Sequence, residues 1–111
     1  MVDPRRVIKT ARTLIKRDGW VQDDSGAPDV GWCITGACDA AAGRLYEDYE
    51  PAIEMLYAKL PWAYKFLFMR PSEAETVKGR HYAACLAAFN DDTDHTVDDV
   101  LELIDKALEE G

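Results

Sequence analysis

The fold is decided by the stretch Gly31-Trp32-Cys33-Ile34-Thr35-Gly36-Ala37-Cys38-Asp39-Ala40-Ala41-Ala42-Gly43, in which nearly every side chain is small. This stretch predicts a short helix from about Trp32 to Ala42 that stops at Gly43. A glycine inside a helix costs about 1 kcal/mol relative to alanine, and the cost is offset if a neighbouring backbone or ring packs against it. The small side chains that share one face are Cys33, Gly36, Ala37 and Ala40. We therefore expect this helix to be the central and most buried one.

The segment before this stretch predicts a helix with clear signals at both ends. Asp3 can act as the N-cap, Pro4 suits the first helical position, and Gly19 lies just past the last turn. Apolar residues recur at helical spacing along one face, at Val7, Ile8, Ala11, Leu14 and Ile15. Residues 20–30 are rich in turn formers and are expected to be a loop, from which Trp20 packs back on the core.

A further helix is predicted over about residues 47–60. Pro61 follows its end, and Pro51 is expected in its first turn, because a proline in a helix interior removes a hydrogen bond and clashes with the preceding turn. In residues 61–70 aromatic side chains alternate with others, as they do in a strand. Because no second strand is predicted to pair with this segment, we expect an irregular or short helical connection.

Two more helices are predicted in the remainder of the chain. One begins at a capping box, with Ser72 as the cap and Glu75 three residues on, and ends before a solvated turn over residues 90–95. The last helix starts at Thr96, with Asp99 at the same capping-box position. Its apolar stripe consists of Val97, Val100, Leu101, Ile104 and Leu108.

Together these elements predict an all-α fold, a compact bundle of about five helices packed around the small-residue central helix. A chain of 111 residues has room for one ordinary hydrophobic core. Residues 1–111 are therefore expected to form a single helical domain.

Several features of the sequence bear on where the protein works. No apolar run approaches the roughly 20 residues that a membrane-spanning helix needs, and the first residues lack the apolar region of a secretory signal. The chain has three cysteines, an odd number that cannot all pair within it, which favours a reducing compartment. We expect a cytoplasmic protein without a membrane as partner.

Charge is distributed unevenly along the chain. The net charge is −8, and residues 90–111, with nine acids and one base, account for all of it. The first helix is basic, with Arg5, Arg6, Lys9, Arg12, Lys16 and Arg17. One interpretation is that the two terminal helices lie side by side with complementary edges, where each exposed ion pair would contribute only about 0–1 kcal/mol. The other is that two separate faces serve two partners.

The order of several short motifs resembles that of a known family. The motifs are Gly19-Trp20-Val21-Gln22, Cys33-Ile34-Thr35-Gly36-Ala37, Phe89-Asn90-Asp91 and Thr96 followed by Asp99-Val100. This pattern is similar to an uncharacterised family of small proteins from actinobacteria and their phages. Phe89 replaces the family's usual tryptophan, Asp99 replaces its usual glutamate, and residues 44–80 are the weakest part of the match. The resemblance implies an all-helical domain and transfers no functional residue.

Cysteine and histidine residues raise the possibility of a metal site or an enzyme. His81 and Cys85 lie one helical turn apart and, with Cys33, could supply soft ligands for zinc. Cys33 and Cys38, five positions apart on one helix, would point about 140° away from each other. Cys33 near a helix start could also be an activated thiol, but no catalytic partner is recognisable. The pattern favours buried apolar cysteines, with no cofactor and no catalytic set.

Two surfaces are candidates for binding a partner. The aromatic run contributes Trp62, Tyr64, Phe66 and Phe68, which are residue types of interface centres, although such a run also suits a core. The acidic last helix contributes Asp98, Glu102 and Asp105.

These surfaces lead to the function that we expect from the sequence. The leading hypothesis is a non-enzymatic accessory protein of a phage or its actinobacterial host, which binds an unidentified protein partner or a second copy of itself. The alternatives are a small metalloprotein or enzyme that uses cysteine and histidine, and an acidic mimic of nucleic acid. Six bases on the first helix could meet phosphates, but an isoelectric point near 4.6 argues against nucleic acid as the partner.

Overall fold

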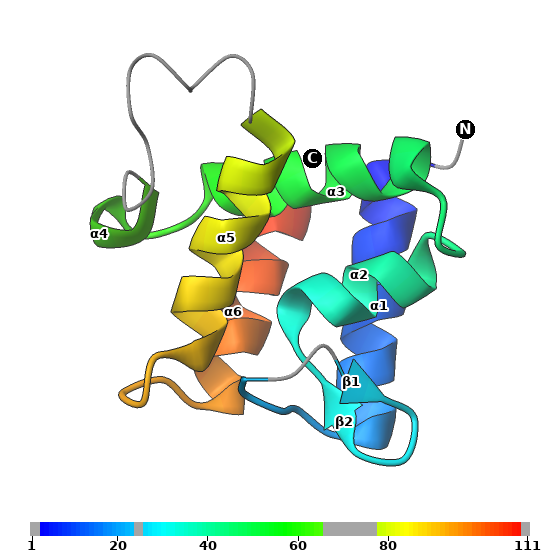
Figure 1. The fold of residues 1–111 in the computed structure, drawn as a ribbon, viewed down its shortest axis with the longest axis horizontal. Coiled ribbons are helices and arrows are strands. Elements are labelled where there is room, and N and C mark those ends of the chain that lie inside the picture. Colours follow the sequence, from blue (N-terminus) through cyan, green and yellow to red (C-terminus); the bar gives the residue numbers. More distant parts are fainter. Residues whose placement is uncertain (1–2, 24–25, 66–77, 110–111) are drawn as a thin grey trace.

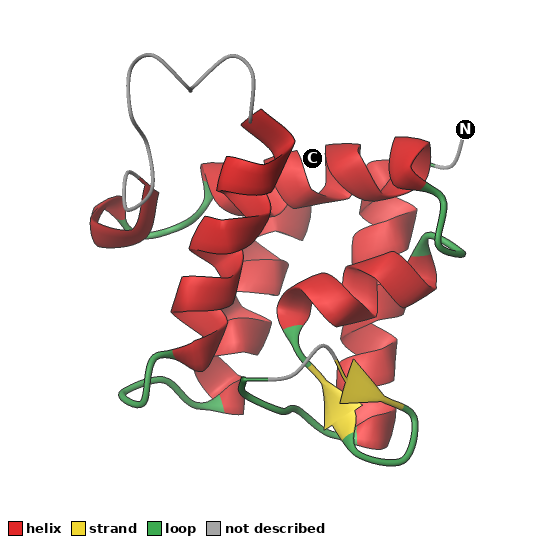
Figure 2. Cartoon of the chain, in the orientation of Figure 1, coloured by secondary structure: helices red, strands yellow, loops and turns green. Residues whose placement is uncertain are grey.

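The computed structural model describes residues 3–23, 26–65 and 78–109, with the backbone alone for residues 78–81. Figure 1 shows the arrangement of the helices, and Figure 2 shows how small the sheet is beside them. Within the described residues the elements are α1 (Pro4–Asp18), β1 (Gly26–Ala27), β2 (Gly31–Trp32), α2 (Ile34–Ala41), α3 (Tyr46–Ala58), α4 (Trp62–Lys65), α5 (Lys78–Asp91) and α6 (Val97–Glu109).

The predicted helical bundle is confirmed, and α2 contacts several of its helices. This helix packs against α1, α3 and α5, as Figure 1 also shows for α1 and α3. Its buried residues are Ile34, Gly36, Ala37 and Cys38. The small side chains therefore let α2 lie close to several neighbours, as the sequence indicates.

The start of α2 was predicted two residues too early, because Trp32 belongs to a strand. Gly26 pairs with Trp32 and Ala27 with Gly31 in an antiparallel hairpin, where a loop was expected. The backbone N–H of Trp32 donates to the Gly19 carbonyl at 2.8 Å, so this residue is fixed to the end of α1. The helix instead begins after Cys33, whose sulfur accepts a hydrogen bond from the Gly36 N–H at 3.2 Å.

α3 differs from its prediction at Pro51. The helix begins at Tyr46 and ends at Ala58, so Pro51 is in the second turn rather than the first. Only the hydrogen bond to the carbonyl of Glu47 is lost, and Glu47 is exposed, where water can replace the missing donor. The proline is therefore tolerated within the helix.

The connection after α3 begins as predicted, with the short helix α4. The capping box of Ser72 and Glu75 lies outside the described residues, as do Phe66 and Phe68. α5 extends to Asp91, so the expected turn over residues 90–95 starts later than predicted.

The last helix begins where the sequence predicts. Asp99 accepts a hydrogen bond from the Thr96 backbone N–H at 2.9 Å, as its capping-box position implies. The apolar stripe predicted for this helix, however, omits Leu103, whose side chain is only 3% exposed in the structure.

The side chain of Asn90 is fully buried at the end of α5, and its carboxamide is fully used in hydrogen bonds. Its Oδ1 accepts from the ring Nε1 of Trp20 at 2.7 Å and from the backbone N–H of Ile34 at 3.1 Å. Its Nδ2 donates to the Val21 carbonyl at 3.0 Å and to Asp91 Oδ1 at 2.9 Å. One side chain therefore joins the segment after α1, the start of α2 and the end of α5.

Residues 22 and 23 add further hydrogen bonds to the end of α5. We call these contacts, together with those of Asn90, the junction. Gln22 donates through Nε2 to the carbonyls of Asn90 at 3.1 Å and Asp92 at 2.8 Å, where the end of α5 leaves acceptors without helical partners. The Asp23 backbone N–H donates to Asp91 Oδ1 at 2.8 Å. Residues 20–23 therefore lie along the end of α5 and are held there by both side chains and backbone.

The two terminal helices lie side by side and run in opposite directions, as one interpretation of the charge pattern predicts. Arg12 Nε lies 2.8 Å from Asp105 Oδ1, and Arg5 Nη2 donates to the Leu108 carbonyl at 3.1 Å. Both side chains of the ion pair are partly exposed, at 32% and 48%, so solvent screens their attraction. The pair helps to orient the helices more than it stabilises them.

Replacement of Asn90 by alanine should lower the free energy of unfolding by about 3 kcal/mol, because the Trp20 ring N–H and the Ile34 N–H would be buried without acceptors. Urea unfolding followed by circular dichroism measures this. Thr10→Ala on the exposed face of α1 is the control and should change stability by less than about 0.5 kcal/mol. A loss below about 1 kcal/mol for Asn90→Ala would show that the junction is not critical.

A second prediction concerns Gly31, which has φ of +102° and lies against the end of α1. A Cβ at this position would lie 3.0 Å from the carbonyl carbon and oxygen of Gly19. Gly31→Ala should therefore cost about 3 kcal/mol, from backbone strain and crowding together. The matched control is Gly43→Ala, at φ of +66° with no atom within 4 Å of the added Cβ, which should cost about 1 kcal/mol. Equal losses in thermal or urea unfolding would contradict the crowding argument.

Candidate functional site: a pocket between α3, α5 and α6

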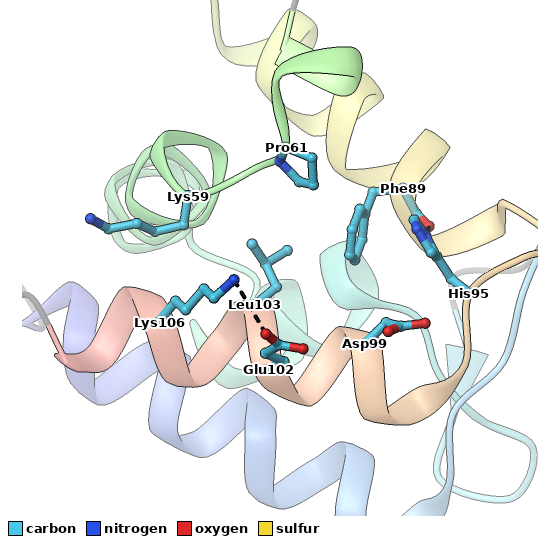
Figure 3. A pocket seen from close by; sticks show the side chains of 8 residues that line it. All are labelled: Lys59, Pro61, Phe89, His95, Asp99, Glu102, Leu103 and Lys106. Atoms are coloured by element: carbon cyan, nitrogen blue, oxygen red, sulfur yellow. Dashed lines mark hydrogen bonds and ion pairs between the residues drawn. The ribbon is translucent and has the colours of Figure 1, made fainter.

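A pocket of about 170 Å³ opens where the end of α3, the end of α5 and one face of α6 meet. Figure 3 shows Pro61, Phe89 and Leu103 pointing toward one another, with charged side chains around them. The lining residues are Lys59, Pro61, Phe89, His95, Asp99, Glu102, Leu103 and Lys106. The pocket thus combines an apolar floor with a rim of both charges.

α6 supplies half of this lining from a single face. Asp99, Glu102, Leu103 and Lys106 recur at the three- and four-residue spacing of neighbours on a helix surface. Glu102 and Lys106 form an exposed ion pair, with 3.3 Å between Glu102 Oε1 and Lys106 Nζ. Leu103 is 3% exposed and belongs to the core, so it anchors this charged face to the interior.

The end of α3 supplies the opposite wall. Lys59 is the C-cap of α3, and its backbone N–H donates to the Leu56 carbonyl at 3.1 Å, while the next N–H, of Leu60, donates to the Tyr57 carbonyl at 3.1 Å. Pro61 then turns the chain, and its carbonyl accepts from the Tyr64 N–H at 2.9 Å in the first turn of α4. The proline that ends one helix therefore also forms part of the pocket.

A cluster of side chains fixes α4 beside the pocket. The Tyr64 hydroxyl donates to Asp92 Oδ2 and lies 3.5 Å from His95 Nε2. His95 Nδ1 lies 2.6 Å from the Phe89 carbonyl, and since a carbonyl only accepts, this nitrogen carries the proton. The Phe89 ring centroid is 4.2 Å from that of His95 and 5.3 Å from that of Tyr64. We call Tyr64, Phe89, Asp92 and His95 the aromatic latch.

The central hydrogen bond of the latch changes the acidity of both partners. The Tyr64 hydroxyl stabilises the ionised Asp92 and so lowers the pKa of that carboxyl, with a further contribution from the Asp94 backbone N–H. The same bond, together with partial desolvation, raises the pKa of Tyr64 to about 12. Near neutral pH the latch therefore holds a neutral phenol against a carboxylate.

The structure places the aromatic residues predicted to bind a partner in different environments. Trp62 directly follows Pro61 and is 77% exposed, which makes it the most exposed large hydrophobic side chain among the described residues. Tyr64 is partly buried and belongs to the latch. Phe66 and Phe68 lie outside the described residues.

The three acids predicted on α6 are also separated. Glu102 is in the pocket rim, and Asp98 is exposed in the first turn. Asp105 instead faces α1 and pairs with Arg12. The structure therefore brings Glu102 to the same pocket as Pro61, beside Trp62 in the chain, and turns Asp105 toward another helix.

The residues considered as metal ligands occupy separate surroundings. Cys33 caps α2, whereas the Cys85 thiol donates to the Lys65 carbonyl at 3.7 Å. His81 belongs to α5, but its side chain is outside the description. Among the side chains that are described, no group of three histidine, cysteine, aspartate or glutamate residues could hold a metal ion. Burial raises the pKa of Cys38 to about 12, so this thiol stays protonated at neutral pH.

Most of the pocket was missed by the sequence analysis. Of its lining, only Glu102 was predicted to bind a partner; Lys59, Pro61, Phe89, His95, Asp99, Leu103 and Lys106 were not. The signal available in the sequence was the spacing of Asp99, Glu102 and Lys106 around Leu103 on one helix face. The contributions of α3 and α5 depend on tertiary packing and have no local signature.

The structure is a small, mostly helical fold with a pocket between α3, α5 and α6. None of the described helices combines the length and the apolar character of a membrane-spanning segment. The sequence profile of a family of unknown function, DUF6197, matches residues 1–110, and the chain belongs to this family. No curated protein and no solved structure matches the chain.

Tyr64→Phe should raise the pKa of Asp92 toward its ordinary value near 4, because the carboxylate loses the hydroxyl that stabilises its charge. The hydrogen bond to Asp92 contributes fully to stability above the pKa that Asp92 has in the unfolded chain. This contribution is lost as the pH falls through the lower pKa that Asp92 has in the folded protein. The variant should therefore lose less stability than the wild type on acidification below about pH 4. Carbon-detected NMR titration of Asp92 measures the shift, with Tyr46→Phe, an exposed tyrosine, as the control. An unchanged Asp92 pKa would disprove the hydrogen bond.

Proposed function

We propose that this chain is a non-enzymatic interaction protein that binds a protein partner through the pocket between α3, α5 and α6 and the adjacent Trp62. The observation that carries the proposal is the exposure of Trp62, 77% of whose surface is open to solvent. This residue begins α4 directly after Pro61, which lines the pocket. We propose further that the protein acts in the cytoplasm of an actinobacterial host or its phage, as the motif resemblance implies.

The exposed tryptophan supports binding because its ring is large and apolar. Burial of such a ring against a partner removes apolar surface from water, and tryptophan is enriched among residues that dominate binding energy. The latch strengthens the argument, since Tyr64 fixes α4 through its bond to Asp92. A side chain on a fixed helix loses less conformational freedom on binding than one on a loose segment.

The acidic side of α6 supports a partner with basic groups. Asp98 and Glu102 are exposed, and the segment from residue 90 onward carries the net negative charge of the chain. Complementary charge accelerates encounter and fixes orientation more than it adds affinity. We therefore assign the apolar residues to affinity and the acids to partner selection.

Pull-down from an actinobacterial lysate tests the proposal with matched variants. Wild-type protein should retain a specific partner, and Trp62→Ala should reduce the retained amount about tenfold or more, because a central anchor is lost. Val30→Ala, which truncates another exposed apolar side chain at 57% exposure, should leave retention unchanged.

Charge reversal tests the contribution of α6 separately. Glu102→Lys should reduce retention about threefold, whereas Asp29→Lys in the exposed hairpin turn should have no effect. Retention that survives Trp62→Ala but is abolished by Glu102→Lys would instead support the acidic mimic of nucleic acid. Absence of any retained protein, or equal retention by all variants, would count against the proposal.

A further inference from the structure

The acidic and basic side chains around the pocket lie toward opposite ends of it. Figure 3 shows Lys59 and Lys106 toward one end and Asp99 toward the other, with Leu103 and Pro61 between them. Along α6 the rim changes from Asp99 and Glu102 to Lys106, over about 10 Å of helix axis. A ligand that spans the pocket therefore meets negative charge at one end and positive charge at the other.

The size of the pocket limits what can enter it. A volume of about 170 Å³ admits one apolar side chain of about the size of leucine and is too small for a whole secondary-structure element. The floor of Pro61, Phe89 and Leu103 is apolar, and two of these residues belong to the hydrophobic core. An inserted side chain would therefore bury its surface against a rigid base, which is the arrangement of an interface anchor.

We infer that the occupant is a segment of a partner protein with a single leucine-sized anchor, a basic residue on one side of it and an acidic residue on the other. The inference rests on the proposed function and specifies the partner of the same site. The basic residue meets Asp99 and Glu102, and the acidic residue meets Lys59 and Lys106. Anchors at helical spacing with flanking charges are a common form of peptide recognition in a groove.

Synthetic peptides provide a direct test. The bipolar peptide has leucine at its centre, with arginine four positions before it and glutamate four positions after it. Two uniform peptides carry arginine or glutamate at both flanking positions, and a fourth peptide is the bipolar one with alanine in place of leucine. Binding is measured at about 0.15 M salt, where long-range attraction to the net charge is screened, by NMR shifts of the Glu102, Leu103 and Lys106 amides.

The discriminating variant is the double replacement Glu102→Lys with Lys106→Glu. It preserves the net charge and keeps an exposed ion pair four residues apart on α6, so the fold is maintained. It cancels the charge difference between the two ends of the pocket. The double variant should therefore bind the bipolar peptide about threefold or more weakly than the wild type, and should bind each uniform peptide as the wild type does. Circular dichroism verifies the fold.

The outcomes separate this inference from the proposed function. Two results together support the inference. The wild type binds the alanine peptide more weakly than the bipolar peptide, and the double variant binds the bipolar peptide more weakly than the wild type does. Unchanged affinity of the double variant for the bipolar peptide, tighter binding of the arginine-only peptide, or no binding would overturn it. Concentration-dependent shifts of the same amides without peptide would identify a second copy of the chain as the occupant and also overturn it. In each of these cases, loss of partner retention by Trp62→Ala would still support the proposed function.

Discussion

The buried carboxamide of Asn90 is the interaction on which the arrangement of the helices depends. Its two donors and its acceptor oxygen are satisfied by groups from the segment after α1, the start of α2 and the end of α5. A buried polar group with all its hydrogen bonds made specifies one geometry, because any displacement leaves a donor or acceptor without a partner in a medium of low dielectric. The end of α5 therefore has a fixed position relative to α2, and the pocket wall that it carries is fixed too.

Several of the short motifs noted in the sequence lie at this junction or beside it. Trp20 and Gln22 bind Asn90 by hydrogen bonds, and Cys33 precedes Ile34, whose N–H binds the same oxygen. These motifs therefore describe in part how the fold is held together. Trp62 and Glu102, which we propose to contact a partner, lie outside them, whereas Phe89 and Asp99 belong both to the motifs and to the pocket lining.

The helix ends predicted correctly are those that depend on residues within one helical turn of each other. Asp3 and Pro4 begin α1, and the Asp99 carboxylate caps α6, by contacts that the sequence spacing already defines. Trp32 was placed in a helix because its partner, Gly19, lies thirteen residues away and leaves no local signal. Asn90 was placed in a solvated turn for the same reason.

The pocket shows most clearly that contacts between distant segments leave no local signal, because its walls come from helices that are separate in sequence. The proposed partner site could therefore be predicted only in part, through Glu102 on α6 and Trp62 beside Pro61. The apolar floor between them required the packing of α5 against the end of α3.

The separation between Trp20 and Asn90 also has a consequence for synthesis of the chain on the ribosome. Trp20 and Asn90 are seventy positions apart, so the acceptor leaves the ribosome long after the indole. Until then the first helix and the small-residue helix can contact each other but not α5, and the apolar surface that α5 covers stays open to other molecules. A chain released before residue 90 lacks this acceptor and the core residues of α6, so it cannot complete the native core.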